Sequence, residues 1–142
     1  MEVGDFFRTS RILKLLDNLH DEIVTASKAN GVDHNLVKAI IVEEQSHVLL
    51  GESFWEENLG IGSTVGLGQI TVGKHGFSRE QLLDAKTNIR AIATHLKSLL
   101  QQPLILPGAP VASLATKYNC GTCRSITAYG RRVVSYYYQV RD

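Results

Sequence analysis

The chain has 142 residues, of which 44% are hydrophobic and 20% are charged, and its formal net charge is +1. This length suits one domain with a sizeable core. No window approaches the roughly 18 uninterrupted apolar residues of a membrane-spanning helix. The near-neutral charge argues against a nucleic-acid partner held by overall electrostatics. We therefore expect one soluble domain over residues 1–142, with no membrane insertion and no nucleic-acid partner.

The N-terminus shows no export signal. Glu2 and Asp5 stand where a signal peptide would be basic, and no apolar core or small-residue cleavage site follows. We therefore expect either an excised or mature piece of a longer chain, or delivery by a route that reads no signal peptide. We expect residues 1–9 to form an extended arm. Apolar spacings of three and four predict a helix over Ser10–Asn30, which Gly31 ends.

The next segment, Asp33–Ser46, predicts the central helix of the domain. Asp33 is a favourable N-cap, and residues 36–42 are too apolar for a surface helix. The helix continues into two carboxylates, Glu43 and Glu44. Because adjacent residues point about 100° apart on a helix, at most one of them can be a buried acid.

The second half of the chain predicts further helices after a glycine-rich loop. Residues 47–60 are mixed and indicate at most one short helix. The glycines between Gly60 and Gly76 exclude a helix there and predict a loop with a short β-ribbon. Later helices are expected to begin at Ser78 and Asp84, the second ending at Pro103, and to span Val111–Tyr118 and Ser125–Tyr138. The fold class is mainly α, with at most a small β element.

Cysteine and histidine spacings give little sign of redox or metal chemistry. Cys120 and Cys123 form a C-x-x-C pair, but the helical spacing of residues 111–119 argues against a thioredoxin-type motif. A local disulfide and two free thiols both stay open. The five histidines lack the spacing of a metal site on one helix, so we expect surface histidines, no metal and no cofactor.

Several stretches, taken in order, carry a family resemblance. They are KAIIVEEQS (38–46), VGLGQI (65–70), DAKTNIRAIATHLKSLL (84–100), ATKYNCG (115–121) and TAYGRRVVSYY (127–137). Together they resemble the soluble lytic transglycosylase family, relatives of goose-type lysozyme. Gly68 replaces the methionine of the family's GLMQI signature, and Cys120 replaces the alanine of its A-x-x-YNAG motif. The resemblance implies an α+β lysozyme-like domain, in which helices surround the central helix and the glycine loop lines a glycan cleft.

The resemblance also implies a set of site residues. Glu44 would be the catalytic acid, with Gln45 where the family usually has serine. Because the segment after Glu44 is longer than is common in the family, the substrate-binding hydroxyl is ambiguous among Ser53, Ser63 and Thr64. The other implied substrate-binding residues are Gly66, Gly68, Gln69, Ile70, Tyr118 and Asn119. Gln69 would bond the sugar or hold the loop, and the Tyr118 hydroxyl would bond near the sugar or to the acid.

The activity implied by the resemblance is cleavage of the MurNAc-β-1,4-GlcNAc bond of peptidoglycan, with formation of 1,6-anhydroMurNAc. Such an enzyme acts in the periplasm or outside the cell, and a secreted or phage-borne effector would fit. An immunity or inhibitor protein could be its partner. Two alternatives stay open. One is a hydrolytic muramidase with a second carboxylate from Glu52, Glu56 or Glu57, and the other is a non-catalytic peptidoglycan-binding component of a secretion or phage apparatus.

Overall fold

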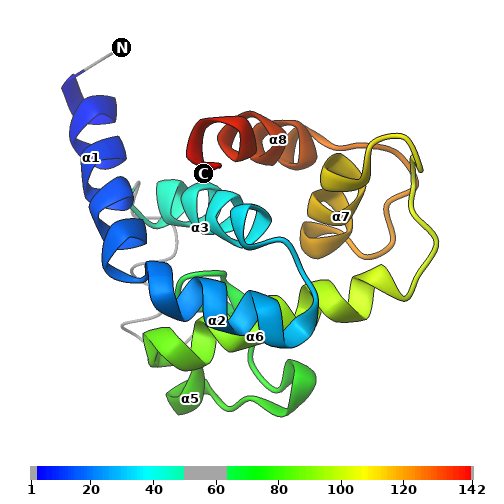
Figure 1. Ribbon diagram of the computed structural model, residues 1–142, viewed down its shortest axis with the longest axis horizontal. Coiled ribbons are helices and arrows are strands. Elements are labelled where there is room, and N and C mark those ends of the chain that lie inside the picture. The colour runs from blue at the N-terminus through cyan, green and yellow to red at the C-terminus, as the bar shows by residue number, and fades with distance from the viewer. Residues whose placement is uncertain (1–2, 50–63, 142) are drawn as a thin grey trace.

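The computed structural model describes residues 3–49 and 64–141, and this part of the chain is predominantly helical (Figure 1). The helices are α1 (Val3–Asn18), α2 (His20–Asn30), α3 (His34–Leu49), α5 (Arg79–Leu83), α6 (Ala85–Leu100), α7 (Pro110–Asn119) and α8 (Ala128–Val140). Between α3 and α5 lie two short strands, β1 (Thr64–Val65) and β2 (Ile70–Thr71), and a 3-10 turn, η1 (Lys74–Gly76). The predicted mainly α class is confirmed.

Helix α3 occupies the centre of the molecule. Figure 1 shows it with α8 on one side and with α2 and α6 on the other, and it also contacts α1 and α7. The apolar run predicted to be buried is buried: Val37, Ile40 and Ile41 are each 0% exposed. The helix starts as predicted, because the Asp33 carboxylate accepts a hydrogen bond from the Asn35 backbone N–H at 2.8 Å.

The N-terminal predictions are partly wrong. Residues 1–9 were expected as an extended arm, but α1 is helical from Val3 onward. The expected helix over Ser10–Asn30 is divided at Leu19 into α1 and α2. Leu19 still donates to the Leu15 carbonyl at 3.0 Å and accepts from the Ile23 N–H at 2.9 Å, so the backbone bends there without losing its hydrogen bonds. Gly31 ends α2 in a left-handed conformation, φ 65°, as predicted.

Local signals placed the following elements correctly. The glycine-rich loop contains the antiparallel β1–β2 ribbon, in which Val65 pairs with Ile70. Ser78 and Gln81 form a reciprocal capping box at α5. The Asp84 carboxylate caps α6 by accepting from the Thr87 N–H at 3.0 Å.

Helices α7 and α8 pack closely against each other. Gly130 allows this contact, since a Cβ at that position would lie 2.2 Å from Thr116 Oγ1. Helix α8 begins at Ala128, after the N-cap Thr127, which accepts from the Gly130 N–H at 3.2 Å; the predicted start at Ser125 was too early. Cys120 and Cys123, in the connecting segment, form a disulfide.

Candidate active site

The two adjacent carboxylates of α3, Glu43 and Glu44, have different hydrogen-bond and charge partners. Glu43 is 1% exposed and is bound by α8: Arg132 Nε and Nη2 donate to its Oε1 at 2.7 and 2.6 Å. His47 Nε2, one turn further along α3, lies 3.0 Å from the same oxygen. This buried ion pair links α3 to α8. Glu43 is therefore a structural residue.

Glu44 is half-buried and has no cationic partner of this kind in the described part of the chain. Its Oε1 accepts one hydrogen bond, from the Tyr129 hydroxyl of α8 at 2.8 Å. Burial raises the pKa of Glu44 from 4.5 to about 7, and the Tyr129 hydrogen bond and the charge of His47 oppose that rise only in part. Glu44 can therefore donate a proton near neutral pH and, once ionised, accept one.

A second tyrosine lies near Glu44. Tyr118, on α7, is 9% exposed, and burial followed by the negative charge of Glu44 raises the pKa of its hydroxyl well above the ordinary value. The hydroxyl donates to the Gly68 carbonyl at 2.6 Å. Of the two roles open for Tyr118, the bond to the acid is made by Tyr129 instead, and the Tyr118 hydroxyl anchors the glycine turn.

The turn between β1 and β2 is fixed on both faces at Gly68. Its N–H donates to Asn88 Oδ1 at 3.0 Å, and its carbonyl accepts from Tyr118. A Cβ on Gly68 would lie 2.4 Å from Ile92 Cγ1 and 2.5 Å from the Tyr118 hydroxyl, so this backbone approaches α6 and α7 too closely for a side chain. Gly66 combines φ 81° with a similar close approach to the Leu82 carbonyl, at 2.6 Å from an added Cβ.

Two glutamines complete the support of this turn. Gln45 Nε2, from the residue after Glu44, donates to the Leu67 carbonyl at 3.2 Å and lies 3.5 Å from the Gly66 carbonyl. Gln69 Nε2 donates to the Gly66 carbonyl at 2.8 Å, so of its two expected roles the side chain fills that of a loop brace. A cavity of about 210 Å³ beside this turn is lined by Gln45 and Gly66 and, on α6, by Ala85 and Asn88.

Two neighbouring histidines, His75 and His95, lie beside Tyr118, which anchors the turn. His95 is 6% exposed, and its ring packs on Tyr118 with ring centroids 4.9 Å apart, so the expectation of surface histidines is wrong here. His75 Nε2 lies 3.1 Å from His95 Nδ1. Burial lowers the pKa of His95 to about 4, with further lowering from Lys74 and His75. The His95 ring is therefore neutral at pH 7 and belongs to the packed support of Tyr118.

The remaining expected site residues are only partly described by the structure. Ser53 and Ser63, like Glu52, Glu56 and Glu57, lie outside the described residues, and Thr64 lies on β1, where it pairs with Thr71. Ile70 is a core residue at 2% exposure, which makes a contact of its side chain with a sugar untenable. Asn119 is exposed at the end of α7.

Sequence reasoning missed four residues that shape the site: Tyr129, Arg132, Gln45 and Asn88. Tyr129 and Glu44 are 85 residues apart, and no local pattern pairs them. The signal available for Asn88 was a polar residue within the apolar stripe of α6, where a fully buried amide needs partners on both its ends; it donates to the Leu82 carbonyl at 2.9 Å.

Wider comparisons add no family assignment. Searches against protein-family models, curated proteins and solved structures found no match. Across residues 3–49 and 64–141, no three or more His, Cys, Asp or Glu side chains gather as they would around a metal ion. In the same part of the chain, none of the helices combines the length and the apolar character needed to cross a bilayer.

Proposed function

We propose that this protein is a lysozyme-like peptidoglycan lytic transglycosylase, with Glu44 as its general acid and base. The observation that carries the proposal is the half-buried Glu44 on the central helix α3, with a pKa raised to about 7. Cleaving a glycosidic bond requires a carboxylic acid that is still protonated near neutral pH. The sequence resemblance selects the same residue on independent grounds.

The proposed reaction needs no second carboxylate. Protonated Glu44 donates to the oxygen that leaves C1 of the muramic acid residue, and the C1–O4 bond breaks. The resulting Glu44 carboxylate takes the proton of the C6 hydroxyl of the same sugar as O6 bonds to C1. The product is a 1,6-anhydro sugar, the carboxyl group regains its proton, and no water is consumed.

The surroundings of Glu44 suit this double role. Glu43 cannot serve as a second catalytic carboxylate, because its Oε1 is engaged by Arg132 and His47 in a buried ion pair. Tyr129 donates to Glu44 and so favours the carboxylate, while burial favours the acid, and the two effects leave both forms populated near neutral pH. The glycine turn, fixed by Asn88 and Tyr118, would form part of the wall of the glycan site.

The proposal is tested by digesting purified peptidoglycan in ¹⁸O-labelled water and measuring the product masses. Transglycosylation predicts anhydro ends that are lighter by one water and free of ¹⁸O. Products that carry one ¹⁸O at the reducing end would show a hydrolytic muramidase instead. Binding to the wall without any cleavage would show a non-catalytic wall-binding component.

A further inference from the structure

The η1 segment, residues 73–77, has an unusual backbone. Gly73 and Gly76 have positive φ, 85° and 84°, and His75 between them has φ 58°. A residue other than glycine seldom adopts this left-handed conformation, although histidine does so more often than most. Such a residue keeps its conformation only where contacts with the rest of the fold hold it. The contacts of His75 therefore decide how firmly this segment is fixed.

The contact that holds His75 comes from α6. His75 Nε2 lies 3.1 Å from His95 Nδ1, and the two ring centroids are 5.0 Å apart. His75 is exposed and His95 is 6% exposed, so the bond joins a surface turn to the core. The backbone bonds of the η1 segment are local, such as that from the Gly73 N–H to the Phe77 carbonyl at 2.7 Å. Among the described residues, the histidine pair is the hydrogen bond that ties the η1 segment to α6.

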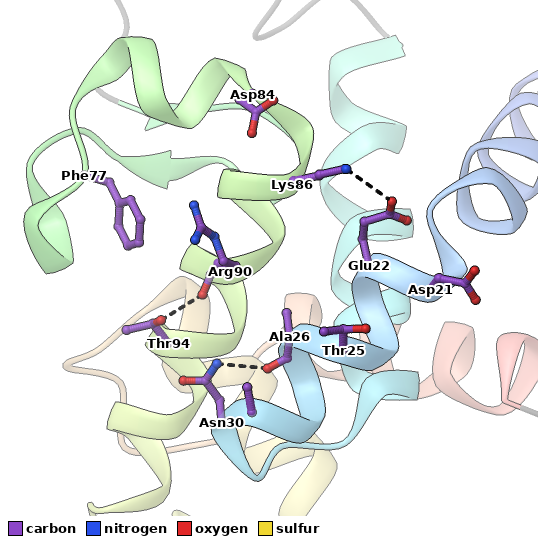
Figure 2. A pocket seen from close by; sticks show the side chains of 11 residues that line it. Asp21, Glu22, Thr25, Ala26, Asn30, Phe77, Asp84, Lys86, Arg90 and Thr94 are labelled. Atoms are coloured by element: carbon purple, nitrogen blue, oxygen red, sulfur yellow. Dashed lines mark hydrogen bonds and ion pairs between the residues drawn. The ribbon is translucent and has the colours of Figure 1, made fainter.

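Packing adds little support to the η1 segment. None of the residues of η1 itself is buried. Phe77, which follows η1, lines a cavity of about 700 Å³ between α2 and α6. Figure 2 shows Phe77 across this cavity from α2, on the same side as Arg90. Because the space beside Phe77 is not filled by other side chains, moving Phe77 costs fewer contacts than moving a core residue.

The hydrogen bond between two imidazoles depends on their protonation. One of the two facing nitrogens must carry a proton, and the other must offer a lone pair. A first proton, taken by the exposed His75, still leaves a donor facing the bare Nδ1 of His95. A second proton, on His95, would place two donors and two positive charges against each other. The contact is therefore stable with one added proton and is lost with two.

The charged groups around the pair set the pH at which this happens. Burial lowers the pKa of His95 to about 4, Lys74 and His75 lower it further, and a backbone hydrogen bond with Tyr118 opposes them in part. Burial, followed by the charge of Lys74, also lowers the pKa of His75. From α7, Tyr118 is neutral, because burial raises the pKa of its hydroxyl. No carboxylate on α2, α3 or another described element shifts the pKa of either ring. The pair is therefore intact at pH 7 and takes its second proton near pH 4.

We propose that His75 and His95 form an acid-sensitive latch, which holds the η1 segment on α6 and opens when both rings are protonated. Opening frees Phe77 from the edge of the cavity and brings water to the His95 ring. That ring packs on Tyr118, whose hydroxyl holds the Gly68 carbonyl, so the glycine turn loosens in the same step. The latch does not rest on the proposed function.

The test is a titration from about pH 7.5 to about pH 3.5, followed by NMR of the imidazole nitrogens and the backbone amides. We expect the amides of Gly73, Gly76 and Gly68 to shift in one step with a midpoint near pH 4, together with His95. His75→Asn should lose this step and show the shifts of the open state already at pH 7. Asparagine suits this variant because it tolerates the left-handed backbone and does not titrate.

A charge change near the pair tests the electrostatic origin of the step. Lys74→Gln should move the midpoint to higher pH, because the charge of Lys74 lowers the pKa of both rings. The matched control is Lys97→Gln, which removes an exposed charge of α6 that shifts the pKa of neither ring. It should leave the midpoint where it is in the wild type.

Three results would overturn the inference: amides of the η1 segment that stay fixed while His95 titrates, an equal step in His75→Asn, or a Gly68 amide that does not follow the segment. Loss of the core resonances of Ile41 in the same step would also overturn it, because acid would then be unfolding the whole chain. None of these measurements uses cleavage of the wall, so failure of the proposed function would leave their outcome unchanged.

Discussion

Glu43 and Glu44 are chemically identical neighbours, and their partners make them different acids. Both come from α3, but one turns toward Arg132 and the other toward Tyr129. An ion pair keeps a buried carboxylate charged, whereas burial with a single neutral donor favours the protonated form. This difference, rather than the depth of burial alone, supports the proposal that Glu44 is the acid.

At the residue scale, Tyr129→Phe should raise the pKa of Glu44 above its present value of about 7. The phenylalanine keeps the ring but removes the hydrogen bond that favours the carboxylate. The measurement is an NMR titration of the Glu44 side-chain carboxyl. Tyr138→Phe is the control, because Tyr138 lies on the same helix and is 61% exposed. A pKa that falls, or that shifts equally in both variants, would contradict the role given to Tyr129.

How far the sequence could predict these residues depends on the range of their interactions. The choice of Glu44 rests on a family resemblance, since the 100° between adjacent helical residues shows only that at most one of Glu43 and Glu44 is a buried acid. The partners that separate them, Tyr129 and Arg132, are 85 and 89 residues away along the chain. Which side chain of α8 faces which residue of α3 depends on how the two helices pack, and no local pattern contains that information.

At the scale of the elements, the glycine turn connects three helices. Gln45 ties it to α3, Asn88 to α6 and Tyr118 to α7. The sequence predicted the loop and the ribbon, because glycine density is a local signal. It also predicted the caps at Asp33 and Ser78, which are satisfied within three residues. It did not predict the anchoring of the turn, which uses side chains from separate helices.

Gly68→Ala should destabilise the protein by about 1–3 kcal/mol and lower wall cleavage. The added methyl group would meet Ile92 and the Tyr118 hydroxyl, which must move to admit it. Chemical denaturation measures the stability, and the digestion assay measures the activity. Gly108→Ala is the matched control, because a Cβ at Gly108 meets no atom within 4 Å. Equal behaviour of the two variants would show that the turn is not held tightly against α6 and α7.

At the scale of the whole molecule, α3 gathers the candidate site from distant parts of the chain. The acid comes from α3, its hydrogen-bond partner from α8, and the turn and its anchors from β1–β2, α6 and α7 (Figure 1). Keeping Glu44 half-buried has a consequence for the entire fold. The folded pKa, about 7, lies above the ordinary 4.5, so ionising Glu44 weakens folding.

The stability contributed by protonated Glu44 is fully present below pH 4.5 and is lost as the pH rises through about 7. Glu44→Gln removes this ionisation. The free energy of unfolding of the variant, relative to that of the wild type, should therefore be about 2 kcal/mol higher at pH 8 than at pH 4. Urea denaturation of both proteins at the two pH values gives the difference. The effect of His95 is opposite to that of Glu44 and is the same in both proteins, because its lowered pKa removes stability as the pH falls from 6.5 to about 4. It therefore cancels in the comparison. A mutational effect that does not depend on pH would show that Glu44 has an ordinary pKa.

The most direct measurement of the central claim is digestion of purified peptidoglycan by wild type, Glu44→Gln and Glu43→Gln, with product masses recorded. Glu44→Gln keeps the shape of the side chain but has no proton to donate, so it should lose at least ~100-fold in rate. Glu43→Gln should lose stability and still release anhydromuropeptides at a temperature where it is folded. Wild-type rates in Glu44→Gln would contradict the assignment of Glu44 as the acid.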